Sequence, residues 1–282
     1  MIFSNTKTLM DFTPKLANVP IERATSSKFL RVIVDENLTW KTHIAALKTK
    51  MNRNAGILFK MKGILPLTVL KSLYHCFIQS HLNHCPLVWG MGTKHNLEPL
   101  FTAQKRAIRT LIPGFANYFY NKDTGEHPCH TKPAFYVNGI PTVHNLILQR
   151  LLTFMHKVNS HTAITQMINM FSLLDFETDT YNHKNILSIF LIPDARLKPH
   201  KNSIFAKGPS LYPKILHEIE LFDPTKYHSL RTKLDKPFKN CIKSYLIKLQ
   251  SQGSENEWSA INFRLHLGSR SSTRSKHATT IT

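Results

Sequence analysis

Two adjacent carboxylates, Asp35 and Glu36, are the first residues in the chain that suggest catalysis. Two-metal catalysis needs carboxylates that hold two metal ions about 3.5–4 Å apart. These two follow the apolar run from Phe29 to Val34, which predicts a short buried strand, and adjacent side chains at such a position point to opposite faces. We therefore expect Asp35 in a turn, no catalytic residue in this chain, and no enzymatic activity from the chain alone.

A second group of residues has the ligand types of a zinc site. The candidate ligands are His127, Cys129 and His130, with His144 or Cys85 as a fourth. Imidazole and thiolate suit zinc, but the spacing matches no standard finger or knuckle. Sixteen histidines in 282 residues produce such clusters by chance. A nucleophilic Cys129 paired with His127 or His130 is a weaker candidate still, because no feature of the sequence indicates an activated thiolate or an oxyanion hole. We expect no metal and no cofactor.

Basic side chains carry the strongest chemical signal. The formal net charge is +20, and the stretch between Asn37 and Leu97 has eight Lys or Arg residues but no Asp or Glu. A solvated helix face normally mixes both signs, so a face of one sign favours contact with phosphates, although a merely solvated face is the alternative. The residues expected to contact nucleic acid are Trp40, Lys50, Arg53, Lys60, Lys105, Arg106 and Arg109. Trp40 is included because an aromatic ring can stack on a base, the alternative being a core position.

Composition limits the remaining classes. Hydrophobic residues make up 42% of the chain, enough for a real core, and the four cysteines form no C-x-x-C pair. Reduced thiols in an intracellular protein, cytoplasmic or nuclear, are therefore expected. No apolar stretch approaches the roughly 20 residues of a membrane span, and the N-terminus does not read as a signal peptide.

Periodicity predicts a mainly α fold that positions these cations. Apolar residues at spacings of three and four predict helices over 40–61, 68–84, 96–112, 142–158 and 236–249, with Thr39, Thr68 and Thr142 as N-caps. Residues 114–141 are loop-like, 161–207 form a partly ordered connector, and the polar, basic tail after Gln250 is expected to be disordered. The β structure should be confined to residues before Val34.

The stretch FLRVIVDENLTWKTH also resembles a pattern at the end of the palm and the entry to the thumb in LINE-type (non-LTR, jockey-like) retrotransposon reverse transcriptases. The match is carried by Phe29, Leu30, Val32, Ile33, Val34, Asp35, Leu38, Trp40 and His43, with Arg31 where the family has Gly. Later elements resemble the same family in the right order: Leu73-Tyr74, Trp89-Gly90, Gln104 to Arg109, His130 to Phe135, Gly208-Pro209, and the helix that begins near Phe238.

The resemblance implies a C-terminal fragment of an RNA-directed DNA polymerase. It implies residual palm strands in residues 1–38, a helical thumb-like domain in 39–160, a C-terminal helical region in 161–250 and a disordered basic tail in 251–282. Phe29, Leu30 and Arg31 would occupy the primer-grip position. The family's catalytic Asp-Asp turn has no counterpart here, so the implied activity is backbone binding of RNA, DNA or hybrid duplexes, with possible association with a catalytic chain. The alternative is an all-helical protein-interaction module without a nucleic-acid role.

Overall fold

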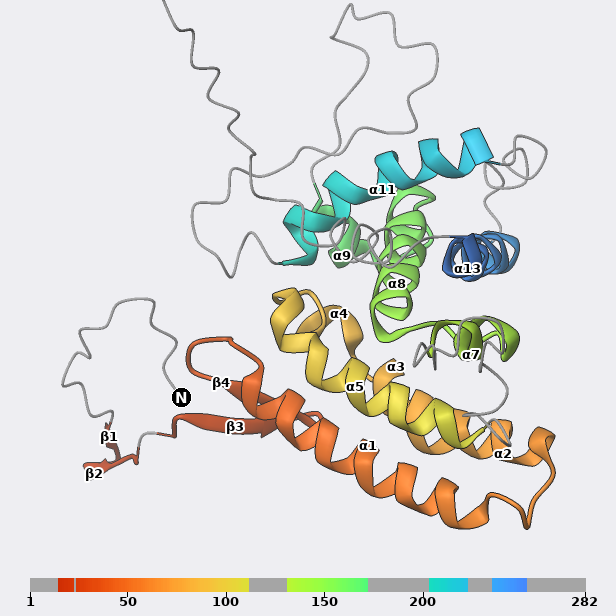
Figure 1. Ribbon diagram of the computed structural model, residues 1–282. Helices are drawn as coiled ribbons and strands as arrows, with labels where there is room; N and C mark the ends of the chain where they lie inside the picture. Colours follow the sequence, from red (N-terminus) through yellow and green to blue (C-terminus); the bar gives the residue numbers. More distant parts are fainter. Residues whose placement is uncertain (1–14, 23, 112–130, 172–202, 223–234, 253–282) are drawn as a thin grey trace, which may run out of the picture.

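The computed structural model describes residues 15–22, 24–111, 131–171, 203–222 and 235–252 (Figure 1). Two small antiparallel β-hairpins come first, and every later described element is helical, so the predicted mainly α fold with a small N-terminal β patch is confirmed. No helix among the described residues is long and apolar enough to cross a membrane.

The strand predicted over Phe29 to Val34 is wrong. The hairpins pair β1 (Lys15–Leu16) with β2 (Val19–Pro20), and β3 (Ser26–Phe29) with β4 (Val32–Asp35). Leu30 and Arg31 form a two-residue turn with φ of 45° and 66°. Both central residues of a type I′ hairpin turn have such positive φ values, normally signalled by Asn-Gly or Gly-Gly. Because Leu-Arg carries no such signal, the apolar run reads as one strand in the sequence.

The first long helix, α1 (Lys41–Met61), has the predicted buried stripe of Ile44, Leu47, Met51, Ala55 and Leu58. Its predicted cap is wrong. Trp40, with φ of 63°, occupies the N-cap position, and no side chain there accepts a bond from the helix. The helix entry is instead held by a carboxylate from the preceding strand, described below.

The next helical stretch has a π-helical segment in its middle. It consists of α2 (Leu67–Tyr74), the π segment η1 (His75–Gln79) and α3 (Ser80–Asn83). Thr68 is not its cap, because the helix begins at Leu67 directly after Pro66. The helix ends before Pro86, as predicted, and the short α4 (Pro86–Trp89) follows. Then α5 (Lys94–Thr110) begins two residues before the predicted start and contains Pro99.

The predicted helix capped by Thr142 is confirmed as α8 (Val143–Asn159), where the Thr142 hydroxyl accepts the N–H of Asn145 at 3.3 Å. Two regions predicted as irregular contain helices. The loop-like range includes α7 (Lys132–Val137), and the connector includes α9 (Thr165–Asn169) and the start of α11 (Ile204–Phe222). Pro209 and Pro213 lie inside α11, and such prolines normally argue against a helix. The last predicted helix is confirmed as α13 (Asp235–Gln252).

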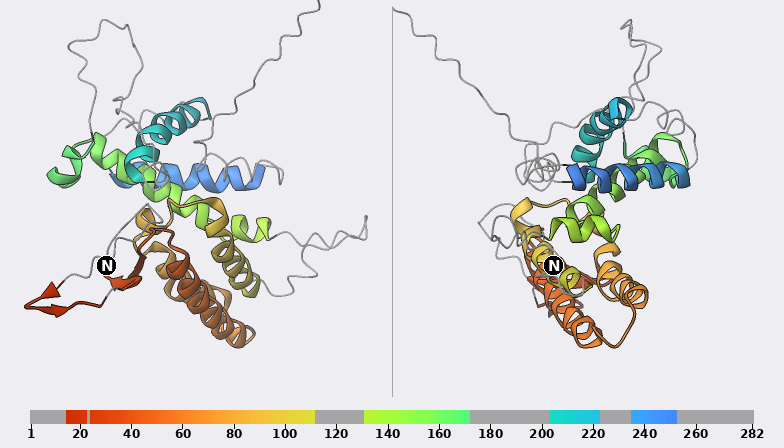
Figure 2. Two further views of the ribbon diagram at one scale, coloured as in Figure 1. Left: turned by 90° about the vertical axis from the view of Figure 1, so that its left-hand side faces the viewer. Right: turned by 45° about the vertical axis from the view of Figure 1, so that its right-hand side comes forward.

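One hydrophobic cluster joins these helices. In Figure 1, α1, α2 and α5 lie below α8, α9 lies beside it and α11 lies above it; Figure 2 shows the same helices from two other sides. The cluster contains the stripes of α1 and α5, the face of α8, and the inward residues of α11 and α13. Periodicity predicts one shared core for eight of the helical residues, and six of them, Ile44, Leu47, Met51, Leu100, Ile108 and Leu111, belong to the cluster. The other two, Leu73 and Phe77, are only partly buried against it. The domain boundary at residue 160 stays a prediction, and the tail from residue 253 lies outside the described residues.

Candidate nucleic-acid interface

The junction between the β3–β4 hairpin and α1 is held by side chains of the first motif. The Asp35 carboxylate accepts the backbone N–H groups of Thr39 at 2.8 Å and Trp40 at 2.7 Å. The His43 ring, one turn into α1, accepts the N–H of Ile33 on its Nδ1 atom at 3.3 Å. Both oxygens of Asp35 therefore join the strand to the helix. Asp35 itself is the last residue of β4, so its predicted place in a turn and the predicted limit of β structure before Val34 are wrong.

The primer-grip-like residues lie at the exposed end of this hairpin. Phe29 is 68% and Leu30 72% exposed, and Arg31 is exposed beside them. The carbonyl oxygen of Leu30 accepts a hydrogen bond from Nε2 of His84, 3.0 Å away, just after α3. The turn is thus attached to the α3 end while its side chains remain accessible.

Lys50 and Arg53 lie on the exposed side of α1, and both are close to histidines from α3. The pKa of His81 is lowered by burial first, and then by the positive charges of Lys50, Arg53 and His84. The pKa of His43 is likewise lowered by burial and then by Lys50 and His84. The structure therefore gathers two predicted cations and three histidines around the end of α3.

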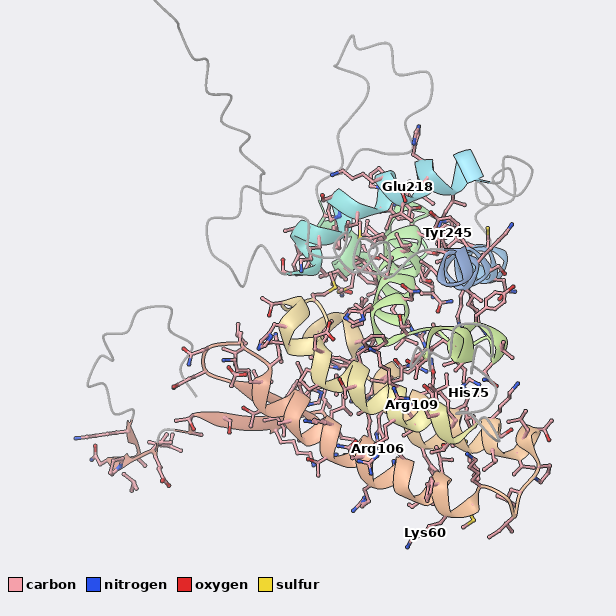
Figure 3. The ribbon with its side chains drawn as sticks, in the orientation of Figure 1. Lys60, His75, Arg106, Arg109, Glu218 and Tyr245 are labelled. Carbon is pink, nitrogen blue, oxygen red and sulfur yellow. The ribbon has the colours of Figure 1, made fainter. Side chains whose placement is uncertain are left out.

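The remaining predicted cations, Lys60, Lys105, Arg106 and Arg109, do not belong to the group at the end of α3. In Figure 3, Lys60 extends beyond the C-terminal part of α1, while Arg106 and Arg109 lie along α5. The Lys105 ammonium lies over the Phe101 ring, 4.2 Å from its centroid, whereas Arg106 and Arg109 are exposed. From α1 through α5 the only acidic residue is Glu98, against eleven Lys or Arg residues. The predicted cations thus form a broad positive surface, and the charges are most closely clustered at Lys50 and Arg53.

Trp40 is half-buried and packs on the hydrophobic cluster. A Cβ placed on Gly92 would lie 3.9 Å from its Cδ1 atom, so the loop before α5 passes close to the ring. The Asn96 side chain also donates to the carbonyl of Thr39 at 3.0 Å. This environment supports the core alternative for part of the ring, and base stacking by the remainder stays a prediction.

The histidines beside Lys50 and Arg53, and a second group of positive charges, were not predicted from the sequence. His75 on η1 has a pKa lowered by burial and then by Lys243 of α13 and Lys71 of α2. Lys243 lies far from the other two in sequence, so only the packing of α13 could reveal this group. For the first group a signal exists, because His81 and His84 have the i, i+3 spacing that places side chains on one helix face.

Other residues that resemble the family motifs lie in the interior of the protein. The buried Gln104 amide donates to the Tyr74 hydroxyl at 3.1 Å and to the Pro141 carbonyl at 3.0 Å, and its oxygen accepts the N–H of Val143 at 2.8 Å. Burial raises the pKa of Tyr74 well above its usual range. Trp89 is fully buried, and a Cβ on Gly90 would lie 2.7 Å from a methyl carbon of Ile147 on α8. These motif positions are therefore explained by packing.

No metal site is present among the described residues, since no group of three or more His, Cys, Asp or Glu side chains could hold an ion there. The candidate ligands His127, Cys129 and His130 lie outside the described residues. Of the two proposed fourth ligands, Cys85 is exposed, whereas His144 is fully buried in α8 with its ring edge toward Phe101, 5.3 Å between centroids.

No protein-family model matches this chain, and comparisons with curated proteins and with solved structures find no match either.

Proposed function

We propose that this chain binds the phosphate backbone of nucleic acid without sequence specificity. The single observation that carries the proposal is the position of Lys50 and Arg53, exposed on α1 beside His81 and His84 in a stretch with no acidic residue. Clustered cations without acidic neighbours are the electrostatic signature of polyanion binding.

Within this proposal, the chain corresponds to the thumb and C-terminal part of a LINE-type reverse transcriptase, with the remaining palm strands in residues 1–38. Two contacts between separate motifs support it: Gln104 donates to the Tyr74 hydroxyl, and the His43 ring lies 5.8 Å from that of Trp89.

The proposed activity is duplex holding, with polymerisation left to a catalytic chain in the cytoplasm or the nucleus. Purified protein should incorporate no nucleotide with any template and divalent metal. Metal-dependent incorporation that is lost in Asp35→Ala would overturn this part of the proposal.

The main test is the salt dependence of duplex binding, measured by fluorescence anisotropy. Each phosphate that a cation neutralises contributes a slope of about −0.9 in log K against log salt on duplex DNA. Lys50→Glu with Arg53→Glu should flatten the slope by roughly two units. The matched control is Lys214→Glu with Lys239→Glu, two exposed cations on α11 and α13, which should leave the slope nearly unchanged.

The basic tail needs its own control. Its Arg264, Arg270, Arg274 and Lys276 can also attract polyanions. Changing these four to Gln in the full chain should lower affinity without removing the effect of Lys50→Glu with Arg53→Glu. If the tail variant abolishes binding and the α1 reversal leaves the slope unchanged, the helical surface is not the binding surface.

A second candidate function, the protein-interaction module, is favoured by an exposed apolar group where α1 meets α2. The group consists of Ile57, Phe59, Met61, Ile64, Leu67 and Val69. Exposed apolar patches of this kind often mark protein contacts. Phe59→Ser with Ile64→Ser should leave duplex affinity intact under the first proposal.

A further inference from the structure

The end of α3 combines permanent and titratable cations in one place. We name Lys50, Arg53, His81 and His84 the histidine cluster. His81 lies in α3 and His84 follows directly after it, and the Asn54 side chain on α1 and the Leu30 carbonyl on the hairpin reach them from two other elements. Three segments distant in sequence therefore build the cluster.

The hydrogen bonds fix which ring nitrogens carry protons. A carbonyl only accepts, so His84 Nε2 donates to Leu30 at 3.0 Å, and the second proton of His84 goes to Nδ1 without breaking this bond. The Asn54 amide nitrogen donates to the Phe77 carbonyl at 2.8 Å and faces His81 Nε2 at 3.3 Å, so that nitrogen accepts in the neutral ring. Protonating His81 therefore requires the Asn54 amide to turn, whereas protonating His84 requires no rearrangement.

Burial first, and then the positive charges around the ring, lower the pKa of His81 in the free protein. Lys50 and Arg53 face this ring from α1, Arg31 lies next to Leu30 in the hairpin turn, and Arg150 of α8 donates to the Asn83 side chain at 3.0 Å. The nearest hairpin carboxylate, Asp35, is engaged at the opposite end of β4.

His43, the third histidine nearby, does not belong to the ligand site. Its Nδ1 already accepts the N–H of Ile33, and the residue is only 7% exposed. Burial, and then the charges of Lys50 and His84, lower its pKa.

We propose that the histidine cluster binds one phosphate group of the nucleic-acid backbone together with a proton, so that duplex affinity rises as the pH falls. This inference rests on the proposed function and adds its point of contact and its pH control. A phosphate between the rings and the two permanent cations favours the charged rings, so the histidine pKa values are higher in the complex than in the free protein. By linkage, affinity then increases as pH falls through the titration range of histidine, about 6.5 when unperturbed.

The first experiment measures duplex affinity of the full chain from pH 7.5 to 5.5 at constant ionic strength. Wild type should gain about tenfold, since each coupled proton contributes up to tenfold per pH unit. His81→Gln with His84→Gln should lose most of this gain, so that the ratio of its affinities at pH 5.5 and pH 7.5 falls toward one. His217→Gln, an exposed histidine of α11, is the matched control and should behave as wild type. An equal gain in the double variant would overturn the proposal.

The second experiment separates this proposal from the proposed function. Histidine pKa values are measured by NMR with and without inorganic phosphate, and with a short duplex. We expect both ligands to raise the pKa values of His81 and His84, and Lys50→Gln, without ligand, to raise that of His81. Phosphate effects without duplex effects would leave an anion site whose ligand is a free phosphate, and the nucleic-acid proposal would fail. Duplex binding that leaves both histidines unchanged would overturn the cluster alone.

Discussion

Helices α1 and α8 are both long and apolar-striped, yet they are buried in different ways. Along α1 only one stripe is inside, and the cations Lys50, Arg53 and Lys60 are exposed on the remaining surface. Along α8 twelve of the seventeen residues are buried and none is fully exposed, and the buried set includes the polar residues His144, Asn145, Gln149 and His156. The difference follows from their neighbours, because α2, η1, α5 and β4 cover one side of α1, whereas α3, α4, α5, α11 and α13 all contact α8.

The buried polar groups of α8 make defined contacts. The Asn145 and Gln149 amides donate to the carbonyls of Leu246 and Lys239 on α13, at 3.5 and 3.4 Å. The His156 ring stacks on Phe238, 3.8 Å between centroids, and its Nδ1 lies 3.3 Å from the Tyr212 hydroxyl. Figure 3 shows Glu218 of α11 near Tyr245 of α13, whose hydroxyl donates to the carboxylate at 3.4 Å. Stability should therefore depend on the α8 surroundings, and polyanion affinity on α1.

The largest expected effect tests the α8 surroundings. Phe238→Ala removes a fully buried ring stacked on His156 and should lower the free energy of unfolding by about 3–5 kcal/mol. The matched control, Phe59→Ala on α1, removes a ring that is 65% exposed and should change it by no more than about 0.5 kcal/mol. Denaturant unfolding measures both. Equal losses would contradict the difference between the two helices.

The next effect tests the seam between α5 and α8. Gln104→Leu leaves the Pro141 carbonyl, the Val143 N–H and the Tyr74 hydroxyl without their buried partner, and should cost about 2–4 kcal/mol. Tyr74→Phe removes one of these bonds and should cost about 1 kcal/mol. A Gln104→Leu variant as stable as Tyr74→Phe would show that the other two bonds contribute little.

A pH-dependent effect tests how α11 meets the loop before α5. Burial lowers the pKa of Lys207 from 10.5 to about 8, although its ammonium donates to the Met91 carbonyl at 2.7 Å. Between these values the unfolded chain binds more protons than the folded chain, so this lysine's contribution to stability rises with pH. Over that pH range, the free energy of unfolding of wild type should rise relative to that of Lys207→Met by at most about 1.4 kcal/mol per pH unit. Lys214→Met, at an exposed site on α11, is the control; a flat difference for Lys207 would mean that its ammonium is solvated.

The smallest effect concerns the entry to α1. Asp35→Ala removes the acceptor for the N–H groups of Thr39 and Trp40 and should cost about 1 kcal/mol, as for the loss of a helix cap. Hydrogen exchange of these two amides should accelerate in Asp35→Ala and less so in Asp35→Asn, which keeps one acceptor oxygen. Unchanged exchange in both variants would show that the carboxylate is not what holds the junction.

The sequence by itself determined the helices with one-sided burial and the charge of their exposed surfaces. The stripes of α1 and α5 and the Thr142 cap could be predicted because periodicity and capping depend on neighbouring residues. The acid-free stretch from Asn37 to Leu97 could be counted directly, and so could the basic residues expected at the surface.

Only the tertiary structure decided which polar residues meet. The Leu30–Arg31 turn carries no turn signal, and α11 keeps its helix through two prolines, so local rules miss both. The partners of Gln104 and of the buried α8 residues come from distant elements, and so does the approach of the Leu30 carbonyl to His84. Hydrogen bonds, and the charge interactions that shift pKa values, act over a few ångströms. Packing rather than sequence spacing sets those distances.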